Sequence, residues 1–119
     1  MSTRCNTHFT QYGATEANVY VHSDGYPDGE HGIPQRFGRF CRDLEEQTTD
    51  TRYGDPAFLA AKFLVWVAGQ YANDPRKPLE FLSVGIMTKD AGDAAYVYTV
   101  DCTSQQRPPV TWTEPARTF

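Results

Sequence analysis

The segment that follows Asp55-Pro56 constrains the fold of this chain more than any other. Asp at the N-cap and Pro at the first helical position start a helix, which we expect to run to about Ala72. Its apolar side chains surround almost the whole circumference: Phe58, Leu59, Phe63, Leu64, Val65, Trp66, Val67 and Tyr71. A helix of this kind is buried on most sides, so the rest of the chain has to cover it.

A second helix is predicted over about 33–48, after a Gly-rich loop and with Pro34 in its first turn. Apolar residues recur on one side of it at helical spacing: Ile33, Phe37, Phe40, Cys41 and Leu44. The other side is charged, and we expect it to be solvated: Arg36, Arg39, Arg42 and Asp43.

The remaining segments have the alternation, or the β-branched and aromatic content, of strands: 3–9, 18–22, 81–87, 95–102 and a short 110–112. The first two are joined by a turn over 11–17 and predict an antiparallel hairpin. We therefore predict an α+β fold in the order β-β-α-α-β-β, with a possible final short strand. A single mixed or mainly antiparallel sheet of four to five strands would carry both helices packed on one face.

The length of 119 residues fits one domain. We place it at 1–104, followed by a Pro-containing C-terminal tail, 105–119, as a candidate for packing on a neighbouring subunit. One sheet covers only one side of the apolar helix, and the other helix covers a second. We therefore expect a third cover from a partner subunit in a homo-oligomer, a dimer with its interface through the helix around Trp66.

Charge and hydropathy exclude several classes of function. A net charge of −4 argues against a binder of bare nucleic acid, which usually shows a basic stripe. No apolar run approaches the roughly 20 residues of a membrane span, and residues 1–6 lack the apolar core of a signal peptide. We expect no membrane association.

Three cysteines, Cys5, Cys41 and Cys102, are odd in number and widely spaced. This pattern favours reduced thiols in a cytoplasmic protein over a disulfide framework. No Cys or His pair shows the close spacing of zinc ligands, so we expect neither a metal site nor a cofactor.

The loop from His22 to Pro27 is the most conspicuous functional candidate. Turn chemistry explains much of it, because Gly25 tolerates a positive φ and Asp24 can bond its own backbone. It does not explain why Tyr20, His22 and Tyr26 cluster there, beside the polar face of the first strand. The predicted ligand-binding set is Arg4, Asn6, Tyr20, His22, Asp24 and Tyr26.

Three alternatives to this ligand-binding interpretation are open. Arg4 can grip a carboxylate or phosphate with its planar fork, or it can form an ion pair with Asp24 that only fixes the loop. His22 and Asp24, two residues apart, also have the residue types of a general base with its orienting carboxylate, which would suit a small hydrolase-like enzyme. A third possibility is an interaction protein that works through the apolar helix.

Two segments of the N-terminal third carry a resemblance to known proteins. They are the opening Met1-Ser2-Thr3-Arg4 and Tyr20-Val21-His22-Ser23-Asp24-Gly25-Tyr26-Pro27, which is followed by a Gly-rich run into a helix. In these segments the chain resembles a family of small uncharacterised proteins of phages, plasmids and integron gene cassettes. Ser23 stands where many members have a large aromatic residue, and Cys5 where many have Ser. The resemblance implies an origin in mobile genetic elements. From the cluster of Arg4, Tyr20, His22, Asp24 and Tyr26, we predict a non-catalytic accessory protein that binds a small anionic or planar ligand or a host protein.

Overall fold

The computed structural model describes residues 3–115 and has the predicted α+β order. Its elements are β1 (Cys5–Gln11), β2 (Ala14–Val21), α1 (Ile33–Gln47), α2 (Pro56–Gln70), β3 (Val84–Ile86), β4 (Tyr96–Asp101) and β5 (Val110–Thr113). The possible final strand of the prediction is present as β5. Residues 116–119, the end of the predicted tail, lie outside the described part of the chain.

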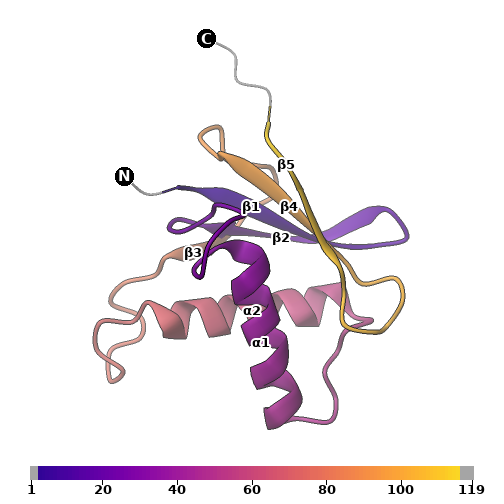
Figure 1. The fold of residues 1–119 in the computed structure, drawn as a ribbon. Coiled ribbons are helices and arrows are strands. Elements are labelled where there is room, and N and C mark those ends of the chain that lie inside the picture. Colours follow the sequence, from indigo (N-terminus) through magenta and orange to yellow (C-terminus); the bar gives the residue numbers. More distant parts are fainter. Residues whose placement is uncertain (1–2, 116–119) are drawn as a thin grey trace.

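The five strands form one mixed sheet in the order β3-β2-β1-β4-β5. β1 is central: it pairs antiparallel with β2 and parallel with β4, and the other neighbours pair antiparallel. Both helices lie on the same face of this sheet, with α1 crossing α2 (Figure 1). The predicted arrangement of one sheet with two helices on one face is therefore confirmed.

β2 and β3 differ most from their predicted bounds, and β1 lies two residues later than predicted. β2 begins at Ala14, because the hairpin closes through only Tyr12 and Gly13, with φ of 51° and 80°; a two-residue turn with both φ positive matches the strand twist. Residues 14–16 are exposed at the hairpin end, so they carry no apolar alternation. β3 is shorter than the predicted strand over 81–87, because Phe81 and Leu82 lie exposed before the strand begins.

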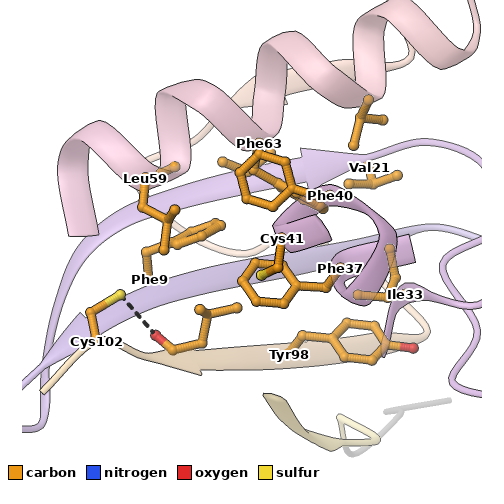
Figure 2. Packing of buried hydrophobic residues seen from close by; sticks show 14 of the residues in the cluster. Phe9, Val21, Ile33, Phe37, Phe40, Cys41, Leu59, Phe63, Tyr98 and Cys102 are labelled. Carbon is orange, nitrogen blue, oxygen red and sulfur yellow. Dashed lines mark hydrogen bonds between the residues drawn. The ribbon is translucent and has the colours of Figure 1, made fainter. Parts of the chain in front are cut away.

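Aromatic rings join the sheet to both helices (Figure 2). Phe9 of β1 lies 6.4 Å from Phe37 of α1 and 5.8 Å from Phe63 of α2, measured between ring centroids. Phe40 of α1 meets Phe63 edge-on at 5.4 Å. These distances are in the range of favourable aromatic pairs, so the predicted apolar faces of the two helices form one core.

Candidate functional site

Three of the predicted site residues come together on the sheet face that points away from the helices. The register pairs β1 with β2 so that Arg4, Tyr20 and His22 share this face. Arg4 Nε donates to His22 Nδ1 over 3.3 Å, and the Tyr20 hydroxyl lies 3.2 Å from the same nitrogen. The guanidinium of Arg4 also pairs with the carboxylate of Asp93. The guanidinium of Arg4 therefore binds a carboxylate, but this carboxylate belongs to Asp93 and not to Asp24.

Asn6, a fourth predicted residue, is fully buried and serves the fold. Its Nδ2 donates to Asn18 Oδ1 over 2.9 Å, and its Oδ1 accepts from the backbone N–H of Ala91. Asp90 adds contacts to His8 at 2.6 Å and to Asn18 at 3.0 Å. These bonds hold the segment between β3 and β4 across the outer face of the sheet, and they leave Asn6 little capacity for a ligand.

The last two predicted residues, Asp24 and Tyr26, belong to a different cluster on the helix side. Asp24 Oδ2 accepts from the Tyr71 hydroxyl over 2.7 Å, and Oδ1 accepts from the Tyr26 hydroxyl over 3.3 Å. Burial raises the pKa of Tyr71 to about 12, so this hydroxyl keeps its proton as a donor. Within residues 3–115 no hydrogen bond joins His22 to Asp24, and the proposed catalytic pair is not assembled.

Arg36 organises this second cluster, and the expectation that it is solvated is wrong. Its side chain is 2% exposed. One terminal nitrogen donates to the Tyr71 hydroxyl over 2.9 Å, and the other to the backbone carbonyls of Ser23 and Asp24 at 3.0 and 2.9 Å. The sequence contains the signal for this burial: Arg36 lies three residues after Ile33 and four before Phe40, on the apolar side of α1.

The rest of the loop is a fixed turn. Asp24, and not Gly25 as predicted, has the positive φ of this turn, 58°. The N–H of Gly25 donates to the Thr3 carbonyl over 2.9 Å, and the Gly25 carbonyl accepts from the Tyr98 hydroxyl over 2.7 Å. With Arg36 bound to two of its carbonyls, the loop is bonded to the segment before β1, to β4 and to α1 at once. Most of its conspicuous sequence is explained by these structural bonds.

A polar pocket of about 230 Å³ opens beside this cluster. It lies where the loop, the first turns of α1 and the last turn of α2 meet, and its lining is Asp24, His31, Arg36, Arg39, Gln70 and Tyr71. Arg39 reaches the Glu30 carbonyl with one terminal nitrogen over 2.7 Å, which leaves its other N–H groups for a ligand. Arg36, Arg39 and Tyr71 are not among the site residues predicted from the sequence.

A larger and more apolar groove, about 590 Å³, lies between α1 and α2 on the side away from the sheet. Its lining is Phe40, Asp43, Leu44, Gln47, Phe58, Ala61, Lys62, Val65, Trp66, Gly69 and Gln70. The indole N–H of Trp66 donates to Asp43 Oδ2 over 2.8 Å, and its ring packs on Phe40 at 6.0 Å. Trp66 is therefore a fixed wall of this groove.

Residues 3–115 contain no group of three or more His, Cys, Asp and Glu side chains that could hold a metal ion. In the same part of the chain no helix is long and apolar enough to cross a membrane. Comparisons with family models, with curated proteins and with solved structures give no match. The resemblance to mobile-element proteins remains a prediction from the sequence.

Proposed function

We propose that this protein is a non-catalytic accessory protein that binds a small anionic ligand in the pocket beside Asp24. The observation that carries the proposal is the charge of this pocket. In the part of the chain that the structure describes, two guanidinium groups, Arg36 and Arg39, line it against a single carboxylate, Asp24. The sequence resemblance to proteins of phages, plasmids and integron cassettes supports a mobile-element origin.

The hydrogen bonds around the pocket favour an anion. Both oxygens of Asp24 already accept bonds from tyrosine hydroxyls, so its charge is partly satisfied within the protein. Among residues 3–115, Arg36 donates only to neutral oxygens, the Tyr71 hydroxyl and two backbone carbonyls. A buried cation without a direct carboxylate partner attracts a negative group, and the fork of Arg39 suits a carboxylate or phosphate.

The size of the pocket and the position of the Tyr71 ring restrict the ligands that it can hold. The volume is below that of most drug-sized sites, so it fits one anionic group or a small molecule. The Arg36 guanidinium already lies over the Tyr71 ring, 5.4 Å from its centroid. That ring face is not free to stack on a planar ligand, so charge is the property that the pocket selects.

Titration calorimetry with inorganic phosphate, at constant ionic strength against chloride, tests the proposal. We expect a dissociation constant below about 1 mM, and a loss of at least about tenfold in Arg39→Gln, because a hydrogen bond to a charged group contributes roughly 1.5–3 kcal/mol. A thermal-shift panel of small phosphorylated and carboxylated metabolites would then identify the class of ligand.

Arg42→Gln is the matched control, because it removes the same charge from the same helix at an exposed position outside the pocket lining. It should bind phosphate like the wild type. Absence of binding at 10 mM phosphate, on the order of ten times that limit, would overturn the proposal. So would equal weakening in both variants, which would indicate non-specific attraction.

A further inference from the structure

α2 presents an apolar ridge on the side that the sheet does not cover. Lys62 is the single charged residue of this helix. The sheet side buries Leu59 and Phe63, whereas Phe58 and Val65 on the opposite side are 57% and 69% exposed. The guanidinium of Arg52 lies over one face of the Phe58 ring, 4.9 Å from its centroid. Large apolar side chains exposed together on one helix mark an interaction surface.

Hollows flank this ridge on both sides. On one side lies the 590 Å³ groove between α1 and α2, and on the other a smaller hollow of about 100 Å³ between α2 and the edge of the sheet. Ala61 lines both. The smaller hollow extends the apolar surface over Ala57 and Leu64 to Ile86, which is highly exposed on the edge strand β3. The two hollows therefore adjoin each other at the ridge.

We propose that this surface is a homodimer interface, in which two copies of the chain each seat the α2 ridge in the α1–α2 groove of the other. The inference is independent of the ligand pocket. A surface that carries both a ridge and an adjoining groove of similar character is self-complementary, which is what a two-fold interface requires. Ala61 and Gly69 keep the approach to the groove clear of large side chains.

The balanced charges of the groove also fit a second copy as the occupant. The groove contributes one charge of each sign, Lys62 from α2 and Asp43 from α1. Two copies facing each other thus bring equal numbers of opposite charges into the contact. A strongly acidic or strongly basic partner would find no matching excess there. Interfaces with few charges at the centre and aromatic walls such as Trp66 are typical of homodimers.

Sedimentation equilibrium of the full chain tests the interface. We expect a species of twice the chain mass of 13.4 kDa at tens of micromolar. Val65→Asp should raise the dimer dissociation constant at least a hundredfold, because it places a charge in the desolvated centre of the contact. Its side chain is largely exposed in one copy, so the variant should keep the wild-type circular dichroism spectrum.

Leu79→Asp is the control: Leu79 is 84% exposed but lines neither hollow, so this variant should remain dimeric. A wild-type chain that stays monomeric at several hundred micromolar would overturn the inference. A dimer that survives Val65→Asp would also overturn it, because the subunits would then meet through another surface.

Discussion

Gly25 lies where the loop after β2 passes closest to the start of β1. A Cβ atom on it would stand 2.8 Å from the carbonyl oxygen of Thr3 and 2.9 Å from Cβ of Cys5. Neither neighbour can move freely, because the Thr3 carbonyl accepts the Gly25 N–H and Cys5 is fully buried in the sheet. The requirement for glycine is therefore steric.

Gly25→Ala should lower the free energy of unfolding by about 1–3 kcal/mol, the usual effect of forcing an extra methyl group into a packed site. Urea denaturation measures it. Gly38→Ala, in α1, is the matched control: no atom lies within 4 Å of its added Cβ, and alanine favours a helix over glycine by about 1 kcal/mol. Equal destabilisation in both variants would contradict the steric explanation.

The sequence could predict part of the candidate site. Strand alternation correctly placed Arg4, Tyr20 and His22 side by side, since the register of a hairpin is a local property. It could not supply their partners: Asp93 lies 89 residues from Arg4, and Tyr71 lies 47 residues from Asp24. Such pairings depend on how the helices and the long β3–β4 connection fold back over the sheet.

Among the elements, the helices were easier to predict than the strands. α1 and α2 begin with clear start signals, and α2 has the expected cap, with Asp55 accepting from the Phe58 N–H. The bounds of β2 and β3 differ from the prediction because their ends are exposed. The exposed start of β2 consists of polar and small residues, and apolar residues stand just before β3. Side-chain pattern predicts a strand only where one face of it is buried.

The turn of the β1–β2 hairpin has one strained backbone position that a substitution could relieve. Tyr12 occupies the first central position of the turn with a positive φ, and its side chain is mostly exposed. Tyr12→Asn would create the Asn-Gly pair that this turn favours. We expect the free energy of unfolding to rise by about 0.5–1 kcal/mol, since asparagine tolerates this backbone region better than tyrosine. A decrease in urea resistance would mean that the Tyr12 ring makes contacts that matter.

At the scale of the whole molecule, the three buried cysteine thiols make the stability of the fold depend on pH. Cys5, Cys41 and Cys102 are free and fully buried, in β1, in α1 and just after β4. Burial raises the pKa of Cys5 from 9.0 to about 12 and that of Cys102 to about 11. An unfolded chain ionises these thiols near pH 9, whereas the folded protein keeps them protonated. Their contribution to stability is therefore complete below pH 9 and is lost as the pH rises towards 12.

We therefore expect a lower free energy of unfolding at pH 10.5 than at pH 8, with about 2 kcal/mol of the difference from Cys5, at roughly 1.4 kcal/mol per pH unit. Urea titrations followed by circular dichroism measure this. Cys5→Ala should reduce the pH dependence by that amount, whatever its effect at pH 8. An unchanged dependence would show that other groups, such as tyrosines, cause the alkaline loss.

The parallel pairing of β1 with β4 has a consequence for synthesis. Cys5 pairs with Tyr96, so the central strand obtains its second neighbour only after most of the chain has been made. At a translation rate of about 5–20 residues per second, the edge of β1 that pairs with β4 stays unpaired on the ribosome for on the order of ten seconds. During that time the hairpin and the helices can form, but the sheet cannot be completed. A nascent chain of this fold therefore needs an aggregation-resistant intermediate, or a chaperone at that edge, until β4 emerges.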